Sequence, residues 1–412
     1  MKRFFPILLA LGGLLQVAGS ADPSAQSDST SSVSKKKAPA KRKAAAKKAP
    51  AKKAPAKAAP AKKATAQKAA PKKKAPAKRV TRHYKPAPPV DPTEGDNVDG
   101  DDLTVRRAAV AALGTMNGAV VAVDPSNGRV LSIVNQKLAL KSGFVPCSTI
   151  KLVTALAGLS DGAIERGTFV HLSRYTSYNL TQAIAHSNNP FFQRLGNQLG
   201  YDRVTHYARM LGLGEKAGLD IPGEEPGAWP EKAPGAGGVG MMTAYGENIL
   251  MTPLELAALL SSIANGGKLY YLQYPRTTEE AGDFTPKLKR TLELAPDGIS
   301  DVKIGMRAAV DSGTARRAGY DPNEPILGKT GTCTDFRMSS HMGWFGSFNE
   351  VDHNQLVIVV MLLGTRTVSG PVASGVAGAI YRNLSEQHYF VADARGSSEP
   401  QRILSTSPCC SR

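Results

Sequence analysis

The sequence predicts one mixed α/β domain, of the α+β kind, whose sheet joins the two ends of the folded region. Three observations support this prediction. Apolar, β-branched runs typical of strands lie near both ends of that region, at 118–135 and 326–363. Helix-periodic segments fill most of the chain between them. The elements do not alternate regularly as strand, helix and strand, which argues against a dinucleotide-binding fold.

The net charge of +18 belongs to one segment of the chain and not to its whole surface. Residues 22–90 hold 21 Lys/Arg and 2 Asp/Glu, a net charge of +19. Residues 91–412 hold 29 Lys/Arg and 32 Asp/Glu, a net charge of −3. The basic composition therefore does not indicate a nucleic-acid-binding fold.

A tract of Lys, Ala and Pro at 35–79 predicts a disordered, extended arm, because like charges repel and proline interrupts helices. We expect this arm and a linker to cover 22–102, with an acidic cluster at 91–102. Two interpretations stay open. The arm binds anionic envelope polymers or lipid headgroups electrostatically, or it is a solvated spacer. No specific nucleic-acid partner is expected of an exported chain.

Residues 1–21 predict an export signal. Lys2 and Arg3 precede an apolar run at 4–18, and small residues at 18–21 suit cleavage. The run is shorter than the roughly 20 residues that span a bilayer, and an uncleaved membrane anchor is the alternative. We therefore expect an exported protein, periplasmic or associated with the cell envelope, in which cysteines can pair.

Ordered structure is expected over 103–390. It begins with a helix at 105–113 and a β-hairpin at 118–135, whose turn holds the strong turn signal Asn127-Gly128. A helix follows Pro146, and its apolar residues recur at core-facing spacing.

Capping signals mark three further helices. Asn179 and Pro190 suit the starts of a helical pair at 179–199. Thr252 and Glu255 suit a capping box at the start of a helix that ends at Asn265. The other expected elements are a loop at 211–229, an irregular stretch at 270–300, a helix at 302–310, strands at 326–333, 341–348 and 355–363, a helix at 372–384, and a polar tail at 391–412.

The stretch at 146–159 carries the first chemical signal. Ser148 and Lys151 are three residues apart at the start of a helix, so their side chains share one face. A serine hydroxyl needs a nearby base to become a nucleophile. Lysine can be that base where apolar packing or another cation lowers its pKa. Taken alone, the pattern also fits an ordinary first turn of a helix.

Two further motifs make the signal specific. A Ser-x-Asn motif follows at Ser187 and Asn189, and a Lys-Thr-Gly-Thr motif follows at 329–332. A Ser-x-x-Lys motif, a Ser-x-Asn element and Lys-Thr-Gly, in this order, are the signature of penicillin-binding proteins and class A β-lactamases. The spacing of the cysteines and histidines matches no zinc pattern, and no metal or cofactor is expected.

With these motifs placed, residues 117–383 resemble the transpeptidase domain of penicillin-binding proteins, in the serine β-lactamase-like (D,D-peptidase) superfamily. The resemblance extends beyond the motifs, to GAVVAVDPSNGRVLSIV at 118–134, AHSNNPFFQRLGNQLG at 185–200 and MTPLELAALLSSIANGGKL at 251–269. It implies an antiparallel sheet flanked by helices, together with an all-helical lobe.

The resemblance also implies an acyl-enzyme mechanism in peptidoglycan cross-linking. Ser148 would attack the carbonyl between the two terminal D-alanines of a stem peptide, and Lys151 would take its proton. β-Lactams would acylate the same serine, because they mimic the D-Ala-D-Ala unit. The resemblance assigns a proton relay to Ser187, a hydrogen bond with the substrate amide to Asn189, positive charge to Lys329, substrate binding to Thr330, Gly331 and Thr332, and an oxyanion hole to the backbone N–H groups of Ser148 and Thr332.

Several alternatives stay open. A D,D-carboxypeptidase, a β-lactamase and a β-lactam sensor share the same fold. A class A β-lactamase needs a glutamate that activates the deacylating water. The chain has no Glu-x-x-Leu-Asn, and nothing marks Glu215, Glu224 or Glu225 as that base. The alternative from another class is a non-catalytic protein that binds the envelope.

The chain departs from the family pattern at two places beside the motifs. Glycine usually precedes the nucleophile in this family, but here the residue is Cys147, and Cys333 lies two residues after Gly331. Some carbapenem-hydrolysing class A β-lactamases carry a disulfide between the equivalent positions. The resemblance therefore implies a Cys147–Cys333 bridge, with two free buried thiols as the alternative. The family's Gly-Gln-Gly is replaced by Gly-Glu-Asn at 246–248.

Overall fold

The computed structural model describes residues 91–235 and 238–391, which belong to one unit of the chain. The predicted export signal, the basic arm and nearly all of the polar tail lie outside these residues. Within them, no helix is both long and apolar enough to cross a membrane. The elements are, in order, α1 (Leu103–Leu113), β1 (Gly118–Asp124), β2 (Arg129–Val134), α2 (Gln136–Ala139), a 3₁₀ turn (Cys147–Ile150), α3 (Lys151–Ser160), β3 (Val170–Ser173), β4 (Thr176–Tyr178), α4 (Leu180–Ala185), α5 (Asn189–Met210), α6 (Gly238–Tyr245), α7 (Pro253–Ala264), β5 (Lys268–Tyr270), α8 (Thr278–Gly282), β6 (Leu288–Thr291), α9 (Gly298–Asp311), a 3₁₀ turn (Arg316–Ala318), β7 (Ile326–Asp335), β8 (Ser340–Asn349), β9 (Val357–Gly364) and α10 (Gly370–Glu386).

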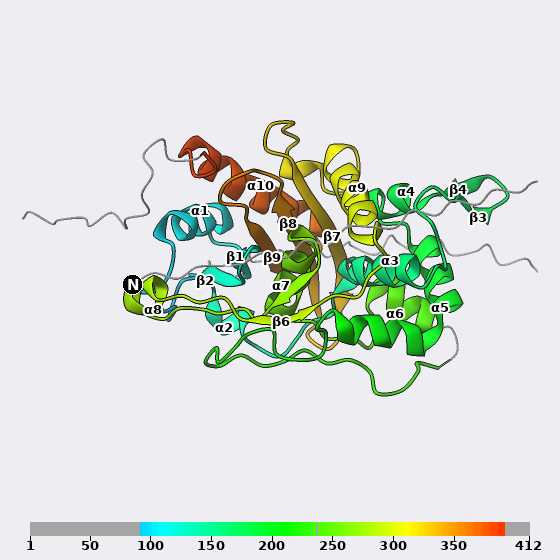
Figure 1. Cartoon of the computed structure of the whole chain (residues 1–412), viewed down its shortest axis with the longest axis horizontal. Helices are drawn as coiled ribbons and strands as arrows, with labels where there is room; N and C mark the ends of the chain where they lie inside the picture. Colours follow the sequence, from blue (N-terminus) through cyan, green and yellow to red (C-terminus); the bar gives the residue numbers. More distant parts are fainter. Residues whose placement is uncertain (1–90, 236–237, 392–412) are drawn as a thin grey trace, which may run out of the picture. The chain divides into compact units, whose positions relative to one another are not determined.

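A five-stranded antiparallel sheet forms the centre of this unit (Figure 1). Its strand order is β2-β1-β9-β8-β7, so that the first and last parts of the folded region pair through β1 and β9. Helices α1 and α10 cover one face of the sheet, and α7 packs against the other. The prediction of a mixed α/β domain with its sheet joining both ends is therefore confirmed, and β7 lies at an edge of the sheet.

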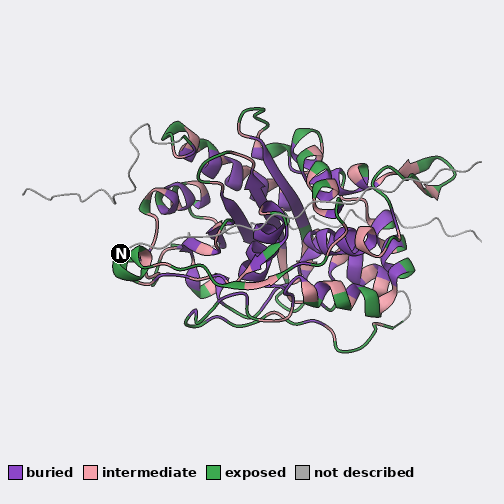
Figure 2. Cartoon of the chain, viewed as in Figure 1, coloured by how far each residue is buried: buried purple, intermediate pink, exposed green. Residues whose placement is uncertain are grey.

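The sheet separates two hydrophobic cores, and the alternation of side chains along each strand serves both. On β1, Val121 and Val123 belong to the core on the α7 side, whereas Val120 and Ala122 belong to the core under α1 and α10. Both sets are almost fully buried, as the purple central strands of Figure 2 show. A strand buried on both faces reads as a continuous apolar run, which is how 118–124 appears in the sequence.

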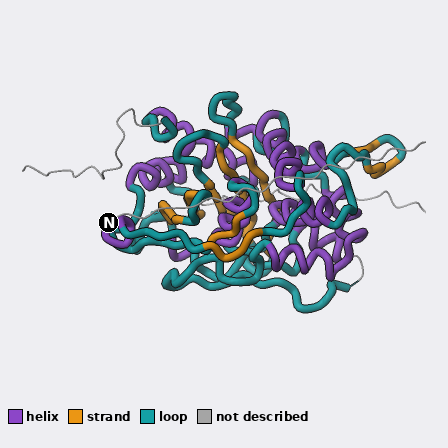
Figure 3. Tube along the Cα trace, in the orientation of Figure 1, coloured by secondary structure: helices purple, strands orange, loops and turns teal. Residues whose placement is uncertain are grey.

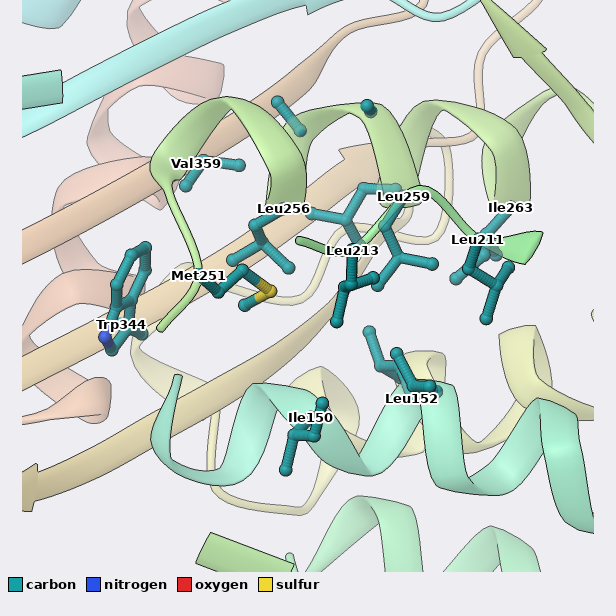
Figure 4. Close-up of a cluster of buried hydrophobic side chains, with 14 of the residues drawn as sticks. Ile150, Leu152, Leu211, Leu213, Met251, Leu256, Leu259, Ile263, Trp344 and Val359 are labelled. Atoms are coloured by element: carbon teal, nitrogen blue, oxygen red, sulfur yellow. The ribbon is translucent and has the colours of Figure 1, made fainter. Parts of the chain in front are cut away.

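The core on the α7 side continues into a lobe of helices formed by α3 to α6 and α9. Leu256 and Leu259 of α7 lie toward Leu213, and Leu152 of α3 approaches from the opposite side (Figure 4). The hairpin of β3 and β4 projects from this lobe (Figure 3). This packing holds α3, and with it the serine–lysine motif, against the side of the sheet where β7 lies.

Most predicted elements are confirmed to within a few residues, including the hairpin, the capping box of α7 and the Asn179 cap of α4. The prediction of an irregular stretch at 270–300 is wrong in part, since β5 pairs with β6 and a short helix, α8, lies between them. The hairpin of β3 and β4 and the helix α6 were not predicted either. These elements are short or rich in glycine, and they depend on contacts distant in sequence.

The prediction that 91–102 is a linker is also wrong. Arg106 on α1 lies 2.8 Å from a carboxylate oxygen of Asp96 and 3.0 Å from one of Asp101, and both carboxylates are almost completely buried. The Tyr274 hydroxyl donates a 2.6 Å hydrogen bond to Asp101. The acidic residues are ordered because they neutralise a buried arginine, since a buried charge is tolerated when it is paired and hydrogen-bonded.

Candidate active site

The candidate nucleophile lies in a tight turn that leads directly into α3. Ser148 belongs to the 3₁₀ turn Cys147–Ile150, and Lys151 is the first residue of the helix. Ile150 and Leu152 are fully buried on either side of the lysine. The Thr149 hydroxyl donates a 2.7 Å hydrogen bond to the Pro146 carbonyl, which ties the turn to its own start. The serine side chain stays half-buried while its neighbours anchor the turn.

The Lys151 side chain is fully buried beside the serine. Its Nζ atom lies 2.9 Å from Ser148 Oγ, 2.9 Å from the Ser187 carbonyl oxygen and 3.1 Å from Ser187 Oγ, and it also contacts Asn189 Oδ1. Burial lowers the pKa of Lys151 to about 6, with a further contribution from the positive charge of Lys329. The amine is therefore mostly neutral at pH 7.

The partners of Lys151 suit a neutral amine, which has two N–H donors and one lone pair. The Ser187 carbonyl and Asn189 Oδ1 can only accept hydrogen bonds, and they take the two N–H groups. The lone pair is left for the hydroxyl of Ser148 at 2.9 Å. A base that is neutral and already hydrogen-bonded to the serine hydroxyl is what nucleophilic activation requires.

A second lysine approaches the same point from β7. Lys329 is fully buried, and its Nζ atom lies 2.8 Å from Ser187 Oγ and 3.0 Å from the Thr330 carbonyl oxygen. Burial lowers the pKa of Lys329 to about 7. The Ser187 hydroxyl thus bridges the two lysines, so the three sequence motifs meet at one serine.

The second motif occupies the junction between α4 and α5. Asn188 caps α5 by accepting a 2.9 Å hydrogen bond from the Phe191 amide, and Pro190 lies in the first turn of that helix. Ser187 adopts a φ of +52°, a conformation that non-glycine residues take at some cost. This backbone turn aims both the carbonyl and the hydroxyl of Ser187 at Lys151.

The third motif lies on the edge strand β7, close to the serine turn. A side chain at Gly331 would place its Cβ 3.1 Å from the Pro146 carbonyl and 3.3 Å from the Cβ of Cys147. Glycine therefore allows the strand to lie beside the nucleophile. Thr332 is exposed, and its Oγ1 accepts a 2.8 Å hydrogen bond from the Gly370 amide.

The structure joins the serine turn to β7 through a disulfide. Cys147 and Cys333 are bonded in the structure, and their Cα atoms lie 5.6 Å apart. The bridge links the residue before Ser148 to the residue after Thr332, so it ties the backbone at Ser148 to the backbone at Thr332. Cys147 adopts a φ of +51°, a left-handed conformation that glycine adopts more readily than any other residue.

A cavity of about 850 Å³ opens beside the disulfide, along the continuation of β7. Trp229, Tyr245 and Phe336 contribute to its apolar lining. Phe336 is 87% exposed, on the turn after β7. Next to it, Arg337 pairs with the buried carboxylate of Asp335. A binding site at a sheet edge with apolar walls and a few polar groups suits an extended peptide ligand.

Some site residues were not predicted from the sequence. Thr314, which contacts Thr330, follows α9 in a stretch that reads as an ordinary helix end. The aromatic lining of the cavity also carried no motif. One feature of the sequence did point to this cavity. The chain departs from the family pattern at 246–248, and Glu247 and Asn248 line the cavity.

The three glutamates considered as a deacylating base hold structure together elsewhere. In the part of the chain that the structure describes, none of them hydrogen-bonds to Ser148 or Lys151. Their partners are Lys289 and Arg290 for Glu215, the amides of Ala217 and Gly218 for Glu224, and the amide of Ser142 for Glu225. Over the same residues, no group of histidine, cysteine and acidic side chains is arranged to hold a metal ion.

A mixed α/β domain in which a serine–lysine pair, a second serine and a second lysine meet at a sheet edge is typical of the serine D,D-peptidase class. Residues 118–386 match the model of the family described as the penicillin binding protein transpeptidase domain. This match covers more than half of the chain, and the protein belongs to that family.

Curated relatives are similar over part of their length. The chain is 26% identical over 313 residues to stage V sporulation protein D of Bacillus subtilis, covering 64% of this chain and 48% of the relative. It is 26% identical over 303 residues to the peptidoglycan D,D-transpeptidase MrdA of Acinetobacter baumannii, covering 59% of this chain and 45% of the relative. The chain thus spans about half the length of these relatives.

Solved structures share the fold. PBP2 of Pseudomonas aeruginosa superimposes with a TM-score of 0.58 at 24% identity, over 72% of this chain and 78% of that one. The transpeptidase domain of penicillin-binding protein 3 from Burkholderia pseudomallei superimposes with a TM-score of 0.60 at 18% identity, over 70% of this chain and 96% of that one. The predicted transpeptidase-like fold is confirmed.

Proposed function

We propose that this protein is a serine D,D-transpeptidase that cross-links peptidoglycan stem peptides ending in D-Ala-D-Ala, through an acyl-enzyme on Ser148. One observation carries the proposal. The buried Lys151 amine, with its pKa lowered to about 6, lies 2.9 Å from Ser148 Oγ. Family membership supports it, and the similar proteins include one named peptidoglycan D,D-transpeptidase.

Acylation begins when Ser148 Oγ attacks the carbonyl carbon between the two D-alanines and Lys151 Nζ takes the hydroxyl proton. The oxygen of the tetrahedral intermediate accepts hydrogen bonds from the amides of Ser148 and Thr332, which the disulfide holds together. The C–N bond then breaks. The proton passes from Lys151 to the Ser187 hydroxyl, 3.1 Å away, and on to the leaving amine of the terminal D-alanine.

Charge and hydroxyl groups on β7 bind the substrate. The terminal carboxylate of the substrate accepts hydrogen bonds from the hydroxyls of Thr330 and Thr332 near the positive charge of Lys329, while Asn189 binds the substrate amide. The rest of the stem peptide runs along the free edge of β7 and into the cavity next to Cys333. The edge position of β7 and the apolar walls of the cavity support this path.

The acyl group then leaves Ser148 for a second nucleophile. An amine from a neighbouring stem peptide attacks the ester carbonyl, loses its proton to Lys151 and completes a cross-link. Water in place of that amine makes the reaction a carboxypeptidation. The engagement of Glu215, Glu224 and Glu225 in structural contacts favours a slowly hydrolysed acyl-enzyme over a β-lactamase.

The same proposal places the protein in the cell envelope. Residues 1–21 direct export, and the protein stays periplasmic or attached to the envelope. The net charge of +19 over residues 22–90 attracts this segment to anionic envelope polymers or lipid headgroups. Sedimentation of the full chain with anionic vesicles, and with anionic polymer, at low and high salt tests this attachment. Binding that does not weaken with salt would contradict it.

Labelling of the purified full chain with a fluorescent penicillin tests the catalytic proposal. We expect a covalent adduct that is stable for hours, unchanged in Ser142→Ala and absent in Ser148→Ala. Ser142 is an exposed serine on the same segment and serves as the matched control. An adduct that forms and disappears within minutes indicates a β-lactamase. The absence of any adduct in the wild-type chain overturns the proposal and favours a non-catalytic envelope-binding protein.

A further inference from the structure

We propose that Thr314 is a positioning residue for the carboxylate of the substrate. Its hydroxyl donates to Thr330 Oγ1 and so directs the proton of Thr330 toward the carboxylate. Thr314 lies outside the three motifs, and this role rests on the proposed function of the site. The carrying observation is a 2.7 Å distance between the Oγ1 atoms of Thr314 and Thr330.

The direction of this hydrogen bond follows from what Thr330 must do. A threonine hydroxyl has one proton to donate and two lone pairs to accept with. A carboxylate can only accept hydrogen bonds, so Thr330 must donate its single hydroxyl proton to the substrate carboxylate. Thr330 is 4% exposed, and within the described residues Thr314 is the hydrogen-bond partner of its hydroxyl. Thr314 must therefore be the donor when substrate is bound.

The neighbouring threonine of the motif is arranged in the same way. Thr332 Oγ1 lies 2.8 Å from the backbone nitrogen of Gly370, at the start of α10. A backbone N–H can only donate, which leaves the proton of Thr332 free for the substrate. The hydroxyls of Thr330 and Thr332 thus each accept one hydrogen bond from the protein, and each keeps its own proton for the carboxylate. Such chains of hydrogen bonds polarise the outer hydroxyl and strengthen its interaction with an anion.

Thr314 is itself held firmly against the second motif. Its amide donates a 3.0 Å hydrogen bond to the carbonyl of Ala185, two residues before Ser187. The preceding residue, Gly313, packs so closely that a Cβ there would lie 2.2 Å from that carbonyl oxygen. The turn after α9 therefore connects the end of α4 with Thr330 on β7. Thr314 fixes the carboxylate-binding hydroxyl relative to the proton-relay serine.

Two variants separate the hydroxyl from the shape of the side chain. Thr314→Val keeps the branched shape and removes the hydroxyl, whereas Thr314→Ser keeps the hydroxyl. The rate constant for acylation of the full chain is measured with a penicillin and with its methyl ester, which lacks the carboxylate charge. We expect Thr314→Val to lower the acylation rate constant about fivefold with the free acid, the effect of one hydrogen bond between neutral groups. With the ester, the rate constant of Thr314→Val should stay within about twofold of the wild-type value. Thr314→Ser should react like wild type with both the free acid and the ester.

Further variants make the role of Thr314 distinguishable from a structural one. Thr168→Val removes an exposed threonine hydroxyl elsewhere and should change neither rate. In a Thr330→Val background, adding Thr314→Val should have no further effect, because the two residues act as one unit. Equal losses with the acid and the ester, or no loss with either, overturn the inference. A wild-type chain that reacts with neither compound overturns the proposed function itself, and the inference with it.

Discussion

The Nζ atom of Lys151 lies 2.9 Å from the Oγ atom of Ser148, at the first turn of a fully buried helix face. No acidic group compensates the lysine there; its polar partners in the described structure are two serines and an asparagine. Burial thus opposes the charged form of the amine, and Lys329 opposes it further. The burial that places the amine beside the serine also lowers its pKa, so the site can be tested through pH.

The pH profile of acylation is the first prediction. Lys151 must be neutral to accept a proton, so the rate constant for a penicillin should rise about tenfold per pH unit up to the pKa of about 6. Lys329 must be charged to attract the carboxylate, so the rate constant should fall above about 7. Second-order rate constants for acylation, measured from pH 4.5 to 9, report the pKa values of the two lysines in the free enzyme. The methyl ester of the same penicillin should keep the acid limb and lose the alkaline limb. An acid limb absent from both compounds would contradict Lys151 as the base.

The second prediction concerns the coupling between the two lysines. Because the charge of Lys329 lowers the pKa of Lys151, Lys329→Met should move the acid limb of the profile to higher pH. The rate constant for acylation of this variant by the free acid should also fall by a factor of roughly 10²–10³, as expected when one partner of a buried charge interaction is removed. The shift is best measured with the ester. Lys137→Met, which removes an exposed lysine, is the control and should leave the limb in place. An unmoved acid limb in Lys329→Met would show that the lysines are not coupled.

The third prediction concerns the disulfide. Titration of the unreduced protein should find no free thiol at Cys147 or Cys333. Replacing Cys147 and Cys333 should lower the free energy of unfolding by about 2–4 kcal/mol. It should also slow acylation, because the amides of Ser148 and Thr332, which we propose as the oxyanion hole, are no longer tied together.

The choice of replacement at Cys147 provides the internal control. Its φ of +51° is easily adopted by glycine and costs alanine roughly 1–2 kcal/mol. Cys147→Gly with Cys333→Ala should therefore be more stable than Cys147→Ala with Cys333→Ala by about 1 kcal/mol in urea melts. Free thiols at both Cys147 and Cys333 in the unreduced wild-type protein would refute the bridge, whereas thiols at Cys409 and Cys410 would not.

The parts of this fold that the sequence predicts are those encoded locally. The capping boxes of Thr252 with Glu255 and of Asn179 with Gln182 mark helix starts within four residues. The Asn127-Gly128 turn marks the hairpin in the same way. Ser148 and Lys151 are likewise one turn apart, so their proximity follows from helix geometry alone.

The parts that escape prediction depend on contacts far apart in the sequence. Asp96 and Asp101 belong to an acidic stretch, and only the fold shows that they neutralise Arg106. Thr314 faces Thr330 because α9 ends beside α4, which no spacing in the sequence reveals. The resemblance to the family implied the roles of Ser187 and Lys329, and the distances that define the site come from the packing of the helical lobe on the sheet.

Glu255 gives the last prediction, because it is a buried carboxylate that catalysis does not use. It is 2% exposed and accepts 2.6 Å hydrogen bonds from the amides of Thr252 and Gly214, so it holds the loop that leads to the cavity against α7. Burial raises its pKa to about 7, although these amides favour the ionised form, and the nearby carboxylate of Glu224 raises the pKa further.

A pKa raised on folding stabilises the protonated state, so the stability due to Glu255 is fully present below its unfolded value of 4.5 and is lost as the pH rises through about 7. The free energy of unfolding should therefore be lower at pH 8 than at pH 5, by up to about 3 kcal/mol from this group. Urea melts at both pH values test this in three proteins: wild type, Glu255→Gln, and Glu279→Gln as an exposed control. Glu255→Gln should lose stability at pH 5 and recover relative to wild type at pH 8, because glutamine cannot ionise, whereas the control should follow wild type. The same dependence on pH in all three proteins would mean that Glu255 stays ionised in the folded chain, held so by the two amides.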